Sequence, residues 1–209
     1  MTPYLLAQAC RNIYTSALGW DHYWVIGGVV IAHQKVDGTD VLVLRGSTTA
    51  GDWVRDAESI PMWHPQLGFC HAGFLKDIDD VFAVVRSVVG SKVIITGHSL
   101  GGARARILAA LFACSGVKVD ITLCVFGSPK PAFVNLQRII EKSGMVHMSF
   151  RNRNDVVPTL PAILPLWCHT ESWQDVDAAP AADNLEPLRD HSIDLYVAAL
   201  SQYVDSSYS

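Results

Sequence analysis

Apolar residues near the start of the chain first follow a helical period and then form two short apolar runs. The spacing predicts one helical face that is built from Leu5, Leu6, Ala9, Ile13 and Tyr14. Residues 25–33 and 41–45 have the composition of strands. Asp37 and Gly38 between them are typical of a hairpin turn. The sequence therefore predicts a helix followed by an antiparallel hairpin.

Downstream of this hairpin, strand-like runs alternate with helical patterns. Further strands are predicted at residues 92–96, 121–126 and 145–151. Helices are predicted at residues 74–89, 100–114, 133–140 and 193–200. The first three of these helices are each followed by a glycine, namely Gly90, Gly116 and Gly144, which is a common stop signal.

The connections are long enough for neighbouring strands to pair in parallel. We therefore expect an α/β fold with a mostly parallel central sheet, helices on both faces and an N-terminal antiparallel hairpin. In such sheets, ligands bind beyond the carboxyl ends of the strands. Ser47, Ser99 and Asp155 each follow a predicted strand, so the pattern gathers three candidate functional residues at one edge of one sheet.

Length and composition narrow the class of protein. The chain has 209 residues, of which 50% are hydrophobic, so we expect residues 1–209 to form a single domain with a sizeable core. The formal net charge of -4 and the lack of a basic stripe argue against nucleic acid as a partner. The longest apolar run, residues 24–32, is too short for a transmembrane segment. No basic segment with a long apolar core begins the chain, so we expect no signal peptide, and either a cytoplasmic location or export by a signal-peptide-independent route.

The five cysteines cannot all pair with one another and lack the spacing of metal ligands. They are Cys10, Cys70, Cys114, Cys124 and Cys168. We expect all five to be reduced. A disulfide between Cys70 and Cys168 is the alternative that the sequence leaves open.

The segment Gly97-His98-Ser99-Leu100-Gly101 lies between a predicted strand and a predicted helix. This context is typical of a nucleophile elbow, a turn so sharp that the serine adopts strained backbone angles and larger neighbours would clash. Gly97, Gly101 and Gly102 would remove those clashes and leave the hydroxyl of Ser99 exposed at the top of the sheet. The alternative interpretation is an ordinary glycine-rich turn.

A serine hydroxyl needs an imidazole to take its proton, and that imidazole needs a carboxylate. After an elbow of this kind the chain order is serine, acid, histidine. Asp155 is the best candidate acid because it follows a strand and the Val156-Val157-Pro158 segment stiffens its loop, although an Asn154-Asp155 turn is the alternative. His169 and His191 are both candidate bases, and the pattern favours His191 only slightly.

The remaining carboxylates after the elbow are weaker candidates for the acid. Asp175, Asp177 and Asp183 lie in a polar, alanine-rich stretch that is typical of a solvated loop. Asp190 adjoins His191, and side chains adjacent in sequence rarely face each other.

Six segments together resemble the class 3 lipases, the α/β-hydrolase family that includes the fungal triacylglycerol lipases. They are Leu44-Arg45-Gly46-Ser47 with Asp52-Trp53 and Asp56 behind it, Cys70-His71-Ala72-Gly73-Phe74, Gly97-His98-Ser99-Leu100-Gly101-Gly102, Phe126-Gly127-Ser128-Pro129, Asn154-Asp155-Val156-Val157-Pro158 and Asp190-His191-Ser192. Their order and spacing match the family through nearly the whole chain, which is far more specific than the elbow alone.

The resemblance implies an α/β-hydrolase fold and a catalytic triad of Ser99, Asp155 and His191. It also implies an oxyanion hole in which Ser47 supplies its backbone N–H and its hydroxyl and Leu100 supplies a second N–H. The amide of Leu100 suits this role because the first residue of a helix has no intrahelical partner for its N–H. His71 and His98 recur in the family and are interpreted as structural. No metal and no organic cofactor is implied.

The expected activity is hydrolysis of carboxylic esters through an acyl-enzyme, with an ester or lipid substrate, also at a lipid–water interface. A short lid-like segment at about residues 48–57, with Trp53 and Val54 as its apolar members, favours short- to medium-chain acyl esters or acylglycerols. A phospholipase or a feruloyl or carbohydrate esterase on the same scaffold is the alternative, because a fold does not settle a substrate. A catalytically silent lipid-binding relative is an alternative of a different class.

Two features depart from the pattern or leave it open. Arg104 and Arg106 stand where the family usually has apolar or small residues, which argues against complete burial of the helix that follows the elbow. Met62, Trp63 and Leu67 lie in a proline-bounded loop. With Trp53 and Val54 they form either part of the core or an acyl-contacting wall.

Overall fold

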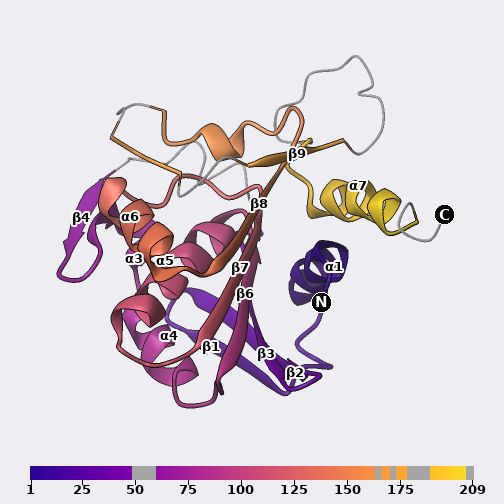
Figure 1. Ribbon diagram of the computed structural model, residues 1–209. Helices are drawn as coiled ribbons and strands as arrows, with labels where there is room; N and C mark the ends of the chain where they lie inside the picture. The colour runs from indigo at the N-terminus through magenta and orange to yellow at the C-terminus, as the bar shows by residue number, and fades with distance from the viewer. Residues whose placement is uncertain (49–59, 163–165, 170–172, 178–188, 206–209) are drawn as a thin grey trace.

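The computed structural model describes residues 1–209 except for 49–59, 163–165, 170–172, 178–188 and 206–209. Within the described residues, one sheet contains seven strands in the order β1-β2-β3-β6-β7-β8-β9 (Figure 1). Their bounds are His22–Ile26, Val29–Val36, Thr39–Leu44, Lys92–His98, Asp120–Phe126, Val146–Asn152 and Gln174–Val176. Strands β1 to β3 pair antiparallel, whereas each later neighbour pairs in parallel. This confirms the predicted mostly parallel sheet with an N-terminal antiparallel hairpin.

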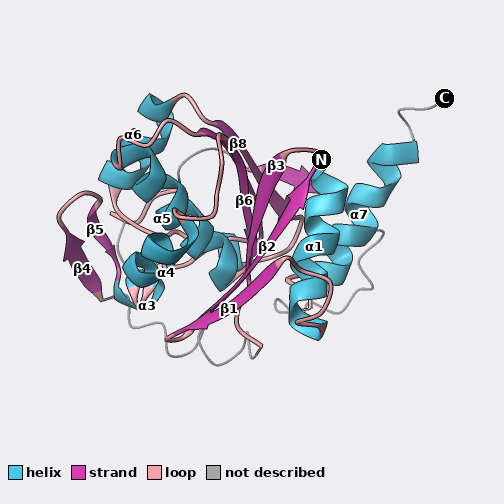
Figure 2. Cartoon of the chain, turned by 90° about the horizontal axis from the view of Figure 1, so that it is seen from below, coloured by secondary structure: helices cyan, strands magenta, loops and turns pink. Residues whose placement is uncertain are grey.

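Helices cover both faces of this sheet (Figure 2). Helices α1 (Pro3–Thr15) and α7 (Ile193–Asp205) lie side by side on one face. The other face carries α3 (Ala72–Leu75), α4 (Ile78–Val85), α5 (Leu100–Cys114) and α6 (Val134–Ser143). In the part of the chain that the structure describes, no helix is long and apolar enough to cross a membrane.

Two hydrophobic cores result from the alternation of side chains along the strands. Val93 and Ile95 of β6 pack into the core beneath α3 to α6, whereas Ile94 between them packs into the core beneath α1 and α7. A central strand that is apolar on both faces is typical of a parallel sheet with two helical layers.

The parallel strands end at a common edge of the sheet. Strand β3 ends at Leu44, β6 at His98 and β8 at Asn152. The segments that carry Ser47, Ser99 and Asp155 therefore leave the same edge, as the sequence predicts.

The strand predicted at residues 25–33 is wrong, because this run contains a turn that separates β1 from β2. Gly27 has a φ of +54°, and a Cβ there would lie 2.3 Å from Cγ of Asp77. The Asp77 carboxylate accepts the N–H of Gly28 at 2.8 Å. The turn thus depends on a residue that is distant in sequence, which no local pattern reports.

The helix predicted at residues 74–89 is also wrong in detail, because it is broken into α3 and α4. Asp77 lies between them with a φ of +62°, in the left-handed region that interrupts a helix. Three further strands were not predicted. Strands β4 (Pro61–His64) and β5 (Gly68–His71) form a second, two-stranded sheet where a loop was expected, and the three-residue β9 lies in the polar stretch.

Helix α5 is buried from Gly101 to Phe112, so the expectation of incomplete burial is wrong. Arg104 donates to the carbonyl oxygens of Gly28 at 3.1 Å and Gly73 at 3.4 Å. Arg106 donates to the hydroxyls of Ser128 at 3.1 Å and Ser149 at 2.5 Å. A buried guanidinium is tolerated when its N–H groups are hydrogen-bonded in this way. Burial lowers the pKa of Arg104 to about 10, against the opposing effect of the Asp77 charge.

All five cysteines are free thiols. Ala132 pairs with Cys70 on one side and with Cys168 on the other. Two strand spacings of about 4.8 Å therefore separate the two cysteines, beyond the limit of about 7 Å between Cα atoms that a disulfide can bridge. The structure excludes the Cys70–Cys168 disulfide.

Candidate active site

Ser99 occupies the sharp turn between β6 and α5, with a φ of +60° and a ψ of -131°. Such angles are strained for any residue with a Cβ. A Cβ on Gly97 would lie 2.4 Å from the backbone of Gly101, and one on Gly102 would lie 2.8 Å from Cβ of Ser128. The glycines of the motif are therefore required by backbone contacts, as the sequence predicts.

The hydroxyl of Ser99 is buried, so the prediction of an exposed hydroxyl is wrong. The side chain is 1% exposed, and its Oγ has no hydrogen-bond partner among the described residues. The Nε2 atom of His191 is likewise buried and without a partner in this part of the chain.

Asp155 and His191 form a buried pair at the same edge of the sheet. Nδ1 of His191 lies 2.8 Å from Oδ2 of Asp155. Gly127, directly after β7, makes room for this pair, because a Cβ there would lie 2.8 Å from Oδ2 of Asp155 and 3.0 Å from Nδ1 of His191. Of the two candidate bases, the structure brings His191 to the carboxylate.

The other candidates lie elsewhere in the structure. Nε2 of His169 contacts the carbonyl oxygen of Pro158. Asp175 and Asp177 are exposed and form ion pairs with Arg151 at 2.7 Å and Arg153 at 2.8 Å. Asp183 lies outside the described residues.

Tyr196 of α7 is a further hydrogen-bond partner of Asp155. It was not identified from the sequence as a candidate residue of the site. Its hydroxyl donates to Oδ2 of Asp155 at 2.5 Å, and the Val157 N–H donates to Oδ1 at 2.9 Å. Burial, followed by the charge and hydrogen bond of Asp155, raises the pKa of Tyr196 well above its ordinary value, so the phenol keeps its proton and acts as the donor. The signal for this role in the sequence is weak, because Tyr196 is a tyrosine within the mainly apolar helix predicted at residues 193–200.

The loop of Ser47 lies beside the elbow. A Cβ on Gly101 would lie 2.1 Å from the carbonyl oxygen of Leu44, which places the start of α5 against the end of β3. A Cβ on Gly46 would lie 3.1 Å from Cβ of Ser99. This packing brings the segment before Ser47 next to the helix that begins at Leu100, while the role of both residues as oxyanion donors stays a prediction.

The predicted substrate contacts fall into two groups. Trp53 and Val54 lie outside the described residues, as do residues 49–57 of the lid-like segment. Met62 and Trp63 are on β4 and are 50% and 59% exposed, so they do not belong to the core, whereas Leu67 is fully buried. Contact of Met62 and Trp63 with an acyl chain stays a prediction.

The two predicted structural histidines are buried near the elbow and the second sheet. His71 caps α3 by accepting the Gly73 N–H at 3.2 Å, and its ring stacks on Phe74 with centroids 4.0 Å apart. His98 contacts the carbonyl of His191 at 2.8 Å.

Comparison with protein-family models identifies the family to which this chain belongs. Residues 41–164, more than half of the chain, match the model of the family described as lipase (class 3). The chain belongs to the class 3 lipase family. The matched region includes Ser47, Ser99 and Asp155 and ends before His191.

Individual relatives of this class 3 lipase chain are fungal lipases. The secreted mono- and diacylglycerol lipase 1 of Fusarium solani is 28% identical over 160 residues, which cover 71% of this chain and 47% of the relative. A lipase of Rhizomucor miehei is 30% identical over 149 residues, which cover 63% of this chain and 40% of the relative. The chain therefore spans less than half the length of these curated relatives.

A solved structure of a triacylglycerol lipase, described as having a serine protease triad as its catalytic centre, superposes with a TM-score of 0.70 at 22% identity. The match covers 85% of this chain and 78% of that structure. The likeness shows that this chain has the α/β-hydrolase fold that the sequence predicts.

Proposed function

We propose that this chain hydrolyses carboxylic esters through an acyl-enzyme formed on Ser99. The hydrogen bond between His191 and Asp155, 2.8 Å long, is the observation that carries the proposal. The ring of this histidine lies 4.6 Å from the ring of His98, the residue directly before the strained Ser99. Membership of the class 3 lipase family and the triad described for a structural relative support the proposal.

In the proposed reaction, Nε2 of His191 accepts the proton of Ser99 as Oγ attacks the ester carbonyl carbon. Asp155 holds the imidazole with its hydrogen on Nδ1 and stabilises the imidazolium that forms. The imidazolium then gives its proton to the departing alcohol, which leaves an acyl group on Ser99. Water, deprotonated by the same imidazole, attacks the carbonyl carbon of this acyl group. The bond to Oγ of Ser99 then breaks, the imidazolium returns the proton to Oγ, and the carboxylic acid is released.

The negative charge on the carbonyl oxygen requires preorganised donors. We assign this role to the backbone N–H groups of Ser47 and Leu100 and to the hydroxyl of Ser47. Leu100 is the first residue of α5, so its amide carries the positive end of the helix dipole. Loss of one donor of this kind costs about 3–4 kcal/mol of transition-state stabilisation.

The proposed substrates are short- to medium-chain acyl esters or acylglycerols, also at a lipid–water interface. One curated relative, described as a mono- and diacylglycerol lipase, supports this class of substrate. An aromatic row that runs from the second sheet to the start of α6 agrees with it, because the ring centroids of Trp63 and Phe69 lie 5.1 Å apart and those of Phe69 and Phe133 lie 5.6 Å apart. Trp63 and Phe69 are 59% and 42% exposed, and aromatic side chains suit a boundary between lipid and water.

The test compares the purified chain with its Ser99→Ala variant on p-nitrophenyl butyrate. We expect turnover to fall by about 10³-fold or more, with an unchanged melting temperature. A fluorophosphonate probe should label Ser99 in the unaltered chain, located by peptide mass spectrometry, and should leave the variant unlabelled. Equal turnover by the two proteins would remove Ser99 as the nucleophile, and an unlabelled, inactive chain would favour the silent lipid-binding alternative.

Substrate class is tested separately with p-nitrophenyl esters of increasing acyl length, each measured below and above its solubility limit. We expect the highest kcat/KM for short to medium chains. Exclusive activity on phospholipids or on feruloyl esters would replace acylglycerols as the substrate while leaving the acyl-enzyme mechanism in place.

A further inference from the structure

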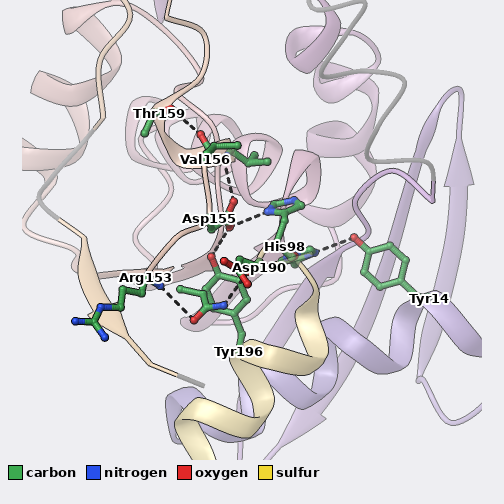
Figure 3. A network of polar contacts seen from close by, with 11 residues as sticks. Tyr14, His98, Arg153, Asp155, Val156, Thr159, Asp190 and Tyr196 are labelled. Carbon is green, nitrogen blue, oxygen red and sulfur yellow. Dashed lines mark hydrogen bonds and ion pairs between the residues drawn. The ribbon is translucent and has the colours of Figure 1, made fainter. Parts of the chain in front are cut away.

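Tyr14 of α1, near the N-terminus of the chain, contacts His98 at the elbow (Figure 3). Its hydroxyl lies 3.1 Å from Nδ1 of His98, the residue directly before Ser99. The two rings meet edge to face, with centroids 6.1 Å apart and an interplanar angle of 69°. A residue of the N-terminal helix is thus in direct contact with the elbow.

The partners of His98 fix the direction of its hydrogen bonds. Nε2 lies 2.8 Å from the carbonyl oxygen of His191, which can only accept, so Nε2 carries the hydrogen. Burial, and secondly the charge of His191, keep the pKa of His98 well below its ordinary value, although the hydrogen bond to the His191 backbone acts in the opposite direction. The ring is therefore neutral, its Nδ1 is an acceptor and the Tyr14 hydroxyl is the donor.

The oxygen of Tyr14 also lies close to the backbone of Gly46, directly before Ser47. A Cβ on Gly46 would lie 2.2 Å from this oxygen and 2.6 Å from the carbonyl oxygen of His98. Gly46 is thus enclosed between Tyr14 and the elbow. Burial raises the pKa of Tyr14 well above its ordinary value, so the phenol keeps the proton that it donates to His98.

These contacts form one continuous path. It runs by close packing from Gly46 to the oxygen of Tyr14, and then by hydrogen bonds from the Tyr14 hydroxyl to Nδ1 of His98 and from Nε2 of His98 to the carbonyl oxygen of His191. It connects the loop after β3, the end of β6 and the loop before α7. Those are the segments that carry the proposed oxyanion donor, nucleophile and base.

We propose that Tyr14 is a positioning residue for ester hydrolysis, holding the Ser47 loop and the His191 loop at a fixed separation through His98. This inference rests on the function proposed above. Tyr14 touches none of the reacting atoms in this scheme and acts through Gly46 and His98.

Removal of the hydroxyl alone should expose this role. In Tyr14→Phe the ring remains, but Nδ1 of His98 loses its hydrogen-bond partner and Gly46 loses its contact with the oxygen. Small displacements of catalytic groups lower rates steeply, by up to about 10²-fold for a shift of about 1 Å. We therefore expect kcat to fall by roughly 10- to 100-fold while KM changes by less than about twofold, because substrate contacts stay in place.

Tyr4 provides a matched control on the same helix. It packs, like Tyr14, against the core beneath α1 and α7, but its hydroxyl accepts only from the side chain of Gln8 at 2.8 Å. Kinetics on p-nitrophenyl butyrate and melting temperatures are measured for the unaltered chain, Tyr14→Phe and Tyr4→Phe. We expect kcat to fall only in Tyr14→Phe.

Three outcomes of these kinetics would count against the inference. An unchanged kcat in Tyr14→Phe would overturn it, as would equal losses of kcat in both variants that follow their losses of melting temperature. A KM effect without a kcat effect would assign Tyr14 to substrate binding. An unaltered chain that is no faster than Ser99→Ala would overturn the proposed function itself, which separates the two failures.

A spectroscopic measurement on the unaltered chain does not depend on the folding of any variant. Nitrogen-15 NMR of the histidine side chains should show His98 as the neutral tautomer with hydrogen on Nε2 from pH 8 down to about pH 5.5. Hydrogen on Nδ1, or a doubly protonated His98 above pH 6, would overturn the proposed network.

Discussion

Tyr196 donates its hydroxyl hydrogen to Oδ2 of Asp155 at 2.5 Å, the same oxygen that lies 2.8 Å from Nδ1 of His191. A single carboxylate oxygen therefore accepts hydrogen bonds from two side chains, one on α7 and one in the loop before it. Because both donors come from one short stretch of chain, the placement of α7 sets the distance between the proposed acid and base.

The first prediction concerns this hydroxyl. Tyr196→Phe should lower the free energy of unfolding by about 1–3 kcal/mol, since a buried carboxylate loses a charge-assisted hydrogen bond. It should also lower kcat roughly tenfold, because Asp155 loses part of its support. Urea unfolding and turnover of p-nitrophenyl butyrate measure the two effects. Tyr4→Phe is the control, and equal stability of the two variants would show that the bond to Asp155 contributes nothing.

The second prediction concerns the carboxylate. Both oxygens of Asp155 accept hydrogen bonds, Oδ1 from Val157 and Oδ2 from His191 and Tyr196. An amide at this position must direct its NH₂ group at one set of donors, which favours the wrong tautomer of His191. Asp155→Asn should therefore lower kcat by about 10⁴-fold, the scale of the equivalent change in a serine protease.

The control for the second prediction is Asp190→Asn, which alters the carboxylate next to His191. We expect this variant to retain kcat within about twofold of the unaltered chain. A nearly normal rate in Asp155→Asn, with a large loss in Asp190→Asn, would transfer the role of the acid to Asp190.

The third prediction concerns stability as a function of pH. Burial lowers the pKa values of both His71 and His98. Below about pH 6.5 the unfolded chain binds protons at these positions and the folded chain does not, so the stability that is present at neutral pH is lost as the pH falls. The loss should reach about 1.4 kcal/mol per pH unit for each histidine.

Urea unfolding between pH 7.5 and pH 5 measures this slope. His98→Gln should reduce it, since one of the two proton-binding differences disappears. An identical slope in both proteins would contradict the burial of a neutral His98.

The fourth prediction separates backbone strain from steric conflict at the two hairpin turns. Gly27 and Gly38 have positive φ values of +54° and +79°, but a Cβ on Gly27 would meet Asp77 at 2.3 Å whereas one on Gly38 would meet nothing within 4 Å. Gly38→Ala should cost about 1–2 kcal/mol of stability from strain alone. Gly27→Ala should cost at least about 1 kcal/mol more, because the Asp77 carboxylate must move away from Gly28.

A double-mutant cycle with Asp77→Ala checks the fourth prediction. In the Asp77→Ala background, the additional cost of Gly27→Ala over Gly38→Ala should disappear. A cost that persists in this background would show that the contact with Asp77 is not its origin.

Elements with a long, regular apolar pattern were predicted from the sequence, while elements that depend on distant partners were not. The helices at α1, α5 and α6 and the strands β6 to β8 follow their local patterns. The turn at Gly27 was missed because its cause is Asp77, and β9 was missed because its three residues gain strand geometry only by pairing with β8.

The same distinction applies to the candidate site. Ser99 and its glycines could be predicted because the elbow is a local conformation that only certain residues tolerate. On the pattern alone His169 and His191 remained close alternatives, because the path of the chain decides which imidazole meets Asp155. Tyr14 and Tyr196 were missed as partners of the site because no local spacing relates them to His98 or Asp155.

The sequence by itself determined the mostly parallel sheet, the elbow and the edge at which Ser47, Ser99 and Asp155 gather. These follow from periodicity and backbone sterics, which act over a few residues. Only the tertiary structure decided which imidazole pairs with the acid, that two arginines are buried in α5, and that Tyr14 connects the loops around Ser99. Hydrogen bonds between residues that are tens of positions apart depend on how the layers pack, and a linear pattern carries no record of that packing.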